Sequence, residues 1–141
     1  MGGNGYLLGF DIGSSFIKAA LIDSATGKLE ASASAPEAEL AIAAPRPGWA
    51  EQDPEVWWEN VAAAARMIRE RAGKAFESVR AIGISYQMHG LVLVDGAGAV
   101  LRPSIIWCDS RAVQTGQQAA KAIGPKKCLK RLLNLPGNFT A

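Results

Sequence analysis

Apolar residues near the start of the chain occur in short runs that polar turns separate. Residues 6–10 and 16–22 form the first two runs, and a polar turn at 23–28 leads into a third run at 29–35. Short runs of this kind, bounded by turn residues, are typical of β-strands. The pattern therefore predicts three consecutive strands that form a meander.

A helix is predicted after a proline-rich loop that covers residues 36–53. The prolines of this loop prevent a long regular element. Asp53 is suited to cap the helix, Pro54 fits its first turn and Gly73 can end it. The apolar residues that recur at helical spacing, and so form the expected core face, are Trp57, Val61, Ala64, Ala65, Ile68 and Ala72.

The second half of the chain predicts a further buried strand, a hairpin and two helical segments. In order, these are a strand at 79–85, a hairpin joining 91–94 to 100–106, a helix at 112–123 and an amphipathic segment with a basic outer face from Lys121 onward. Asp109 or Ser110 can cap the helix at 112–123. The order of these elements predicts an α/β fold, with a mixed sheet and flanking helices.

Composition and charge narrow the classes of protein to which the chain can belong. Its 141 residues are 49% apolar, which is enough to build the buried core of one domain. The formal net charge is +2 and like charges form no block before residue 121, so we expect neither a nucleic-acid surface nor a membrane surface. No apolar stretch approaches the roughly 18 residues that a membrane span needs.

The cysteine and histidine content argues against a zinc site. Cys108 and Cys128 lie far apart in the sequence, and His89 is the one histidine. Two isolated thiols of this kind are typical of reduced cysteines in a cytoplasmic protein.

The turn between the first two predicted strands combines a carboxylate, a glycine and two hydroxyl groups. Its polar residues are Asp11, Ser14 and Ser15, and Gly13 is expected to allow a backbone bend that is closed to most residues. The N–H groups of such a turn can bind phosphate, and a carboxylate can hold hydrated Mg²⁺. The same residues also suit an ordinary hairpin, and they leave both interpretations open.

A polar segment, Gln87-Met88-His89, follows the strand predicted at 79–85. Ligand groups often lie where a buried strand of an α/β sheet emerges. His89 could bond to a sugar hydroxyl or, alternatively, to a neighbouring carbonyl group. Asp109 could likewise contact a ligand or cap the next helix. The residues alone do not decide between these alternatives.

Five segments, in their order and spacing, resemble those of one enzyme family. They are residues 9–15, 47–55 with the following Trp57-Trp58, 83–90, 101–111 and 136–141. Together they resemble the xylulose kinases of the FGGY carbohydrate kinase family, which have a ribonuclease H-like, actin-type ATPase fold. Within that family, the segment Gln87-Met88-His89-Gly90 resembles xylulose kinases and differs from glycerol kinases. The resemblance extends over nearly the whole chain.

The resemblance implies a reaction that transfers the γ-phosphoryl group of ATP to the 5-hydroxyl of D-xylulose, with Mg²⁺ required. It implies that Asp11 is the catalytic carboxylate, close to the metal and the transferring phosphate. It also implies that the cofactor-binding turn consists of Gly13, Ser14 and Ser15. Alignment and charge stabilisation are the main demands of phosphoryl transfer, and a rigid hairpin with a metal-binding carboxylate can meet them.

The resemblance also implies where the sugar binds. The substrate-binding residues would be Gln87, Met88, His89 and Asp109, with Trp107 as a further contact. His89 would orient hydroxyl groups, and Met88 would pack against the carbon face of the sugar. A small-molecule ketose is therefore the expected partner, and a homodimer is left open.

Members of the family are about three times as long as this chain, a size consistent with two domains. Residues 1–141 are thus expected to form the N-terminal, sugar-binding part of the first kinase domain, without the second domain, the adenine site or the aspartate that activates the sugar hydroxyl. Alone, the chain is expected to have little or no kinase activity.

Two other functions are alternatives to the kinase. One is a non-catalytic sugar-binding or assembly module that keeps the same fold. The other is a nuclease, which would need several acidic residues around two metal ions. Only Asp11 is well placed for such a role, so the nuclease is disfavoured.

Overall fold

The computed structural model describes residues 5–136, which divide into two compact units. The first unit contains residues 5–41 and 55–87, and the second contains residues 42–54 and 88–136. Most of the family-like segment 136–141 therefore lies outside the described residues. Across residues 5–136, no helix combines the length and the apolar character needed to cross a membrane.

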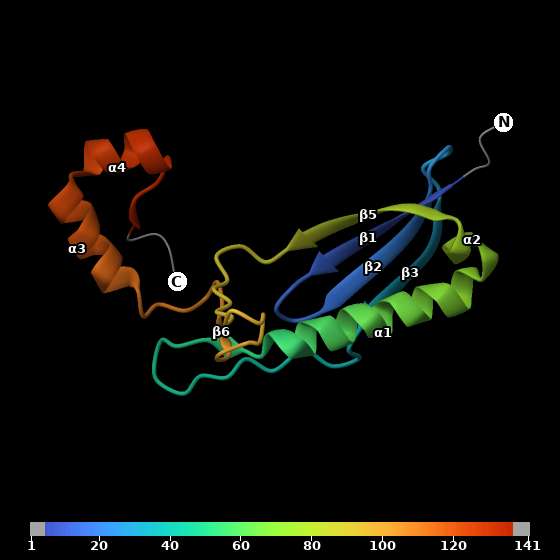
Figure 1. The fold of residues 1–141 in the computed structure, drawn as a ribbon, viewed down its shortest axis with the longest axis horizontal. Coiled ribbons are helices and arrows are strands. Elements are labelled where there is room, and N and C mark those ends of the chain that lie inside the picture. The colour runs from blue at the N-terminus through green and yellow to red at the C-terminus, as the bar shows by residue number, and fades with distance from the viewer. Residues whose placement is uncertain (1–4, 137–141) are drawn as a thin grey trace. The chain divides into compact units, whose positions relative to one another are not determined.

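A four-stranded mixed sheet forms the centre of the first unit (Figure 1). The strands are β1 (Tyr6–Ile12), β2 (Ile17–Asp23), β3 (Leu29–Ala35) and β5 (Val79–Tyr86), in the order β3-β2-β1-β5. β1 and β2 are antiparallel, as are β2 and β3, whereas β5 runs parallel to β1. The predicted meander and the predicted α/β class are thus confirmed.

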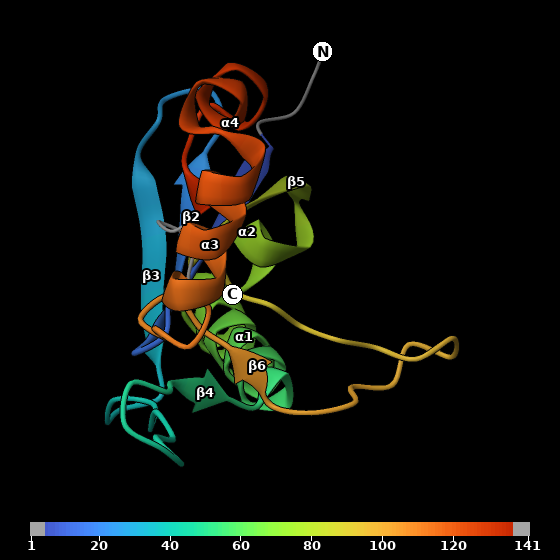
Figure 2. The ribbon, with the colours of Figure 1, turned by 90° about the vertical axis from the view of Figure 1, so that its left-hand side faces the viewer.

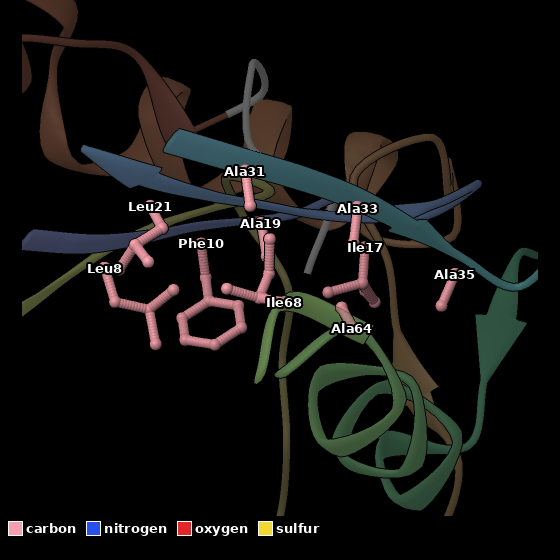
Figure 3. Packing of buried hydrophobic residues seen from close by; sticks show 10 residues of the cluster. All are labelled: Leu8, Phe10, Ile17, Ala19, Leu21, Ala31, Ala33, Ala35, Ala64 and Ile68. Atoms are coloured by element: carbon pink, nitrogen blue, oxygen red, sulfur yellow. The ribbon is translucent and has the colours of Figure 1, made fainter. Parts of the chain in front are cut away.

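The core of the first unit lies between this sheet and α1 (Pro54–Ala72). Alternate residues of the strands face the helix, as Figure 3 shows for Leu8 and Phe10 of β1. Ala64 and Ile68 of α1 are fully buried against them. The helix face predicted from the spacing of apolar residues is therefore the face that packs on the sheet.

α1 ends where the sequence predicts. Gly73 follows its last residue with a φ of 53° and donates its N–H to the carbonyl oxygen of Arg69 at 2.9 Å. A residue with a positive φ directly after a helix is usually glycine, because glycine has no Cβ to clash in that conformation. A short helix, α2 (Lys74–Glu77), which the sequence did not predict, then leads into β5.

β5 is exposed along nearly its whole length, so the burial predicted for residues 79–85 is wrong. Ile82 and Ile84 are 60% and 61% exposed. Among the described residues β5 ends the sheet, and β1 is the strand that pairs with it. An apolar groove lies beside β5, lined by the two isoleucines together with residues of β1, α1 and α2. The local pattern predicts a strand but contains no information on what covers it.

The second unit contains a small sheet that connects three distant segments of the chain. β4 (Glu51–Gln52) pairs antiparallel with β6 (Ser104–Ile105) (Figure 2). Two isolated antiparallel bridges, from Ala43 to Glu51 and from Leu91 to Ile105, extend this pairing on either side. We call this arrangement of residues 43, 51–52, 104–105 and 91 the platform.

The hairpin predicted for residues 91–94 and 100–106 forms only in part. The chain does turn at Asp95, whose N–H donates to the carbonyl oxygen of Ala99 at 2.9 Å, and Val94 forms a bridge with Val100. The regular strand, however, is limited to β6. Asp95 instead stabilises the turn locally, since its carboxylate accepts the N–H groups of Ala97 and Ala99.

Helices follow the platform in the described part of the second unit (Figure 2). α3 (Val113–Ile123) agrees with the predicted helix, but Ala112 occupies its N-cap position and makes no side-chain cap bond, so the caps predicted at Asp109 and Ser110 are wrong. α4 (Pro125–Leu132) presents the predicted basic side chains to solvent and buries Cys128. Both cysteines are free thiols, and Cys108 is exposed.

Candidate functional site

A hydrogen bond from the N–H of Gly13 to the carbonyl oxygen of Phe16, 3.1 Å long, closes the turn between β1 and β2. A Cβ atom at Gly13 would lie 3.0 Å from the same oxygen. Gly13 does not adopt the positive φ that Gly27, for example, has. The expected reason for this glycine is therefore corrected: the turn needs it because the backbone is crowded there, rather than because of a forbidden bend.

The two serines of this turn are half-buried. The carbonyl oxygen of Ser15 accepts the N–H of Leu40 at 2.9 Å, and Leu40 packs against the core of the first unit. Two backbone hydrogen bonds, one within the turn to Phe16 and one from Leu40, thus hold the turn in place. Because the N–H of Gly13 is already bonded to Phe16, it is not available to a phosphate, whereas Ser14 and Ser15 provide two hydroxyl groups in the same turn.

Asp11 lies near the end of β1, on the sheet face opposite α1. Leu8 and Phe10 point toward the helix (Figure 3), and side chains alternate along a strand, so Asp11 points the other way and is exposed. It pairs in register with Lys18 of β2 and with Ser85 of β5. A shallow depression is lined by Asp11 and Lys18 together with other residues of β1, β2 and β3, most of them small.

Asp11 could serve as a ligand for Mg²⁺. Within residues 5–136 there is no group of three or more His, Cys, Asp and Glu side chains that could hold a metal ion. Mg²⁺ bound with a nucleotide does not need such a group, because waters and phosphate oxygens provide most of its ligands and one or two carboxylates complete the site. An exposed carboxylate beside a turn with two serines fits that requirement.

Gln87 follows β5 and lies beside the end of β1. Its backbone N–H donates to the carbonyl oxygen of Ile12 at 3.0 Å. Its side-chain amide nitrogen and oxygen are both buried, and neither has a hydrogen-bond partner in the described part of the chain. Buried polar groups in folded proteins are nearly always hydrogen-bonded, so such an amide is a reasonable ligand group.

Met88 and His89 form an exposed turn at the start of the second unit's larger segment. His89 has a φ of 59°, in the left-handed region that few residues other than glycine adopt. Met88 is 67% exposed, although methionine is usually buried. Two residues later the platform begins, where Leu91 and Ile105 exchange backbone hydrogen bonds of 2.8 and 3.2 Å.

Asp109 is buried, and hydrogen bonds within the second unit engage its carboxylate. One oxygen accepts the backbone N–H of Ala50 at 2.7 Å, and both oxygens accept Nε of Arg111 at 2.9 Å. Burial alone would raise the pKa of Asp109, but the hydrogen bonds from Arg111 and Ala50 outweigh it and hold the pKa below its usual value. The side chain is ionised and anchored at neutral pH.

Arg111 joins Asp109 to a second carboxylate. Its Nη2 lies 2.7 Å from Oδ2 of Asp109 and 2.7 Å from Oε1 of Glu51. Its guanidinium carbon lies 3.7 Å from the centre of the Trp49 ring. The hydrogen bond to Asp109 and, after it, the hydrogen bond to Glu51 raise the pKa of Arg111. Arg102 forms a further ion pair with Glu51.

This ion cluster was not predicted from the sequence. Glu51 and Arg111 occur in two of the family-like segments, at 47–55 and 101–111, but no feature of either segment indicated that they pair. The sequence feature that could have indicated the pair is the presence of opposite charges in two segments that resemble the same family.

The predicted site residues fall into both units. Asp11, Gly13, Ser14 and Ser15 lie in the first unit, and Gln87 joins them through its bond to Ile12. Met88, His89 and Asp109 belong to the second unit, where the platform links Leu91 to the segment containing Asp109. The roles of all these residues toward a ligand stay predictions.

Comparison with known proteins gives matches over nearly the whole chain. The family model described as the FGGY family of carbohydrate kinases, N-terminal domain, matches residues 6–140. The xylulose kinase of Escherichia coli (strain K12) is 34% identical over 134 residues, which are 95% of this chain and 26% of that relative. A glycerol kinase of Delftia acidovorans is 38% identical over 108 residues, which are 76% of this chain and 21% of that relative.

Solved structures give the same result for the fold. The crystal structure of a xyloylose kinase from Brucella ovis superposes with a TM-score of 0.85 at 34% identity, over 95% of this chain and 27% of that chain. The likeness confirms the expected fold class, that of the actin-like ATPases. It also means that this chain spans little more than a quarter of the solved kinase.

Proposed function

The chain belongs to the FGGY family of carbohydrate kinases, and from this premise we propose that it contributes to a kinase that transfers the γ-phosphoryl group of ATP to the 5-hydroxyl of D-xylulose. The observation that carries the proposal is the adjacency of two strand ends. Asp11 lies near the end of β1, and the serine turn follows that strand. Gln87, bonded to Ile12, follows β5 and leads directly into Met88 and His89. The similarity to the xylulose kinases of Escherichia coli and Brucella ovis favours a ketose as the sugar.

On the nucleotide side, Asp11 would hold the hydrated metal, and Ser14 and Ser15 would donate hydrogen bonds to phosphate oxygens. Bound Mg²⁺ would neutralise charge on the transferring phosphoryl group. Gly13 contributes space: its lack of a side chain lets the turn close tightly against Phe16. A rigid turn of this kind orients the phosphates at little entropic cost.

On the sugar side, Gln87 and His89 would bond to hydroxyl groups, and Met88 would cover the carbon face of the sugar. During transfer, the oxygen of the 5-hydroxyl bonds to the γ-phosphorus while the bond from that phosphorus to the bridging oxygen of ADP breaks. The hydroxyl proton passes to a base, which we expect outside residues 1–141.

We further propose that residues 1–141 correspond to the N-terminal part of the first kinase domain, and that a longer polypeptide carries the second domain. The chain covers 26% of the Escherichia coli relative, which supports this view. Alone, it would lack part of the cleft that excludes water from the reaction. The exposed edge of β5 would favour self-association of the isolated chain, including a homodimer. The free thiols are compatible with the cytoplasmic location expected from the sequence.

A coupled assay of ADP release tests this proposal. The chain alone and the complete reading frame that contains it are each supplied with ATP and Mg²⁺, and with D-xylulose or glycerol. We expect turnover only from the complete product, and with D-xylulose preferred. Turnover by the chain alone would contradict the assigned domain, and preference for glycerol would contradict the assigned sugar. Sugar binding by the complete product without turnover would favour the non-catalytic module.

A further inference from the structure

We propose that Asp109, Arg111 and Glu51 act together as positioning residues, which hold the Met88–His89 turn in the shape that binds the sugar. The inference rests on the proposed function for the identity of the ligand. It gives Asp109 an indirect role in place of the direct sugar contact expected from the resemblance. The three residues belong to the second unit, as does the turn.

The cluster is built as a rigid connection. Arg111 donates from Nε to both oxygens of Asp109 and from Nη2 to Oδ2, while Nη2 also reaches Glu51. Stacking on Trp49 fixes the plane of the guanidinium group. A planar fork bonded at several points has little freedom, and lysine could not reproduce this geometry.

From the cluster, backbone pairing leads step by step to the turn. Asp109 accepts the N–H of Ala50, whose carbonyl oxygen accepts the N–H of Ile106 at 3.1 Å. Glu51 pairs with Ile105 across β4 and β6, and Ile105 bonds to Leu91 in both directions. Leu91 stands two residues after His89. The ion cluster and the turn are thus attached to the same platform.

The turn needs this attachment because packing gives it little support. Every residue from 88 to 99 is exposed. His89 also has a backbone conformation that is unfavourable for a side-chain-bearing residue, and such a conformation persists only where the surroundings impose it. The bond between Leu91 and Ile105 is therefore well placed to keep the turn in register, and the cluster keeps Ile105 in place.

The experiment compares Arg111→Met with Lys121→Met in the full 141-residue chain. The first removes the guanidinium fork but keeps an apolar stem, and the second removes an exposed cation on α3, outside the cluster. Amide hydrogen exchange is measured at Leu91, at Ile105 and along β2, and D-xylulose binding is measured by calorimetry. Exchange along β2 reports whether the first unit is intact.

We expect Arg111→Met to speed amide exchange at Leu91 at least tenfold and to leave exchange along β2 unchanged. It should also weaken D-xylulose binding by about tenfold or more, because the groups that bind the sugar are no longer held in position. Lys121→Met should change none of these. Unchanged exchange at Leu91, or faster exchange with unchanged sugar affinity, would overturn the inference.

Two further outcomes are informative. If even the unaltered chain fails to bind D-xylulose, the result counts against the proposed ligand, while exchange at Leu91 still supports or overturns the positioning of the turn. If Arg111→Met unfolds the second unit, Arg111→Lys decides the question, because it keeps the charge but loses the fork. Sugar affinity equal to that of the unaltered chain would then overturn the inference.

Discussion

The backbone N–H of Gln87 donates to the carbonyl oxygen of Ile12 at 3.0 Å, which ties the residue after β5 to the last residue of β1. The residues after β1 form the serine turn, and the residues after Gln87 form the Met88–His89 turn. One backbone contact therefore connects the beginnings of the two segments to which the proposed function assigns phosphate and sugar.

The side chain of Gln87 should lower the stability of the fold and contribute to sugar binding. Its buried amide has no partner among residues 5–136, and removing such a group should be neutral or stabilise the fold by about 1–2 kcal/mol. We expect Gln87→Met to leave the free energy of unfolding in urea unchanged or to raise it, while weakening sugar binding. Gln114→Met, on the exposed surface of α3, is the control and should alter neither. A clear loss of stability in Gln87→Met would mean that the amide stabilises the fold.

Asp11 should matter for nucleotide binding and little for folding. Because its side chain is exposed, Asp11→Asn should change the free energy of unfolding by less than about 0.5 kcal/mol. The same change should weaken Mg²⁺-dependent ATP binding at least tenfold. Calorimetry on the protein encoded by the complete reading frame, with and without Mg²⁺, measures this affinity. Glu30→Gln, an exposed change on β3, provides the control. Equal ATP affinity in Asp11→Asn and Glu30→Gln would argue against Asp11 as the metal ligand.

Gly13, in the turn between β1 and β2, should not tolerate a side chain, in contrast to Gly83 in β5. A Cβ at Gly13 would lie 3.0 Å from the carbonyl oxygen of Phe16, whereas a Cβ at Gly83 of β5 would meet no atom within 4 Å. Gly13→Ala should therefore destabilise the chain by about 1–3 kcal/mol, as overpacking usually does. Gly83→Ala should be neutral or slightly stabilising, because alanine is less flexible than glycine in the unfolded chain. Urea denaturation of both variants tests the contrast, and equal stabilities would refute it.

Stability should fall in acid because Asp109 loses its charge. Burial alone would raise the pKa of Asp109, but its bonds to Arg111 and Ala50 outweigh this and keep the folded-state pKa below the unfolded value. The stabilisation is thus complete above the unfolded pKa of about 3.9 and is lost as the pH falls through the lower, folded value.

Asp109→Asn should be less stable than the unaltered chain at pH 7, by about 3 kcal/mol, since it breaks a buried ion pair. The difference should shrink as the pH is lowered below about 4, which unfolding midpoints at a series of pH values would reveal. Glu70→Gln, an exposed change on α1, should follow the unaltered chain throughout. An undiminished difference in acid would show that Asp109 stabilises the fold by shape rather than by charge.

Local patterns predicted the elements whose residues interact with sequence neighbours. The meander could be predicted because its strands follow one another through short turns, and α1 because Ala64 and Ile68 repeat at helical spacing between Pro54 and Gly73. The segments 9–15 and 83–90 were recognised as candidate site segments for a similar reason, since each is a continuous stretch.

Features that depend on distant pairing could not be predicted in this way. Ile82 and Ile84 have the composition of a buried strand, yet their exposure depends on what lies beside β5. β4 and β6 are two residues long and exist because each pairs with the other across a long stretch of chain. The sequence favoured a helix cap for Asp109, because nothing in the local pattern indicated that Arg111 donates hydrogen bonds to its carboxylate.

Two guanidinium groups lie over the ring of Trp49. The guanidinium carbon of Arg111 is 3.7 Å from the ring centre, and that of Arg46 is 4.9 Å from it. Nearby positive charge alters the fluorescence emission of an indole. The emission of Trp49 therefore reports whether Arg111 is stacked on its ring. With the other three tryptophans changed to phenylalanine, fluorescence would record the docking of Arg111 in real time and without any added label.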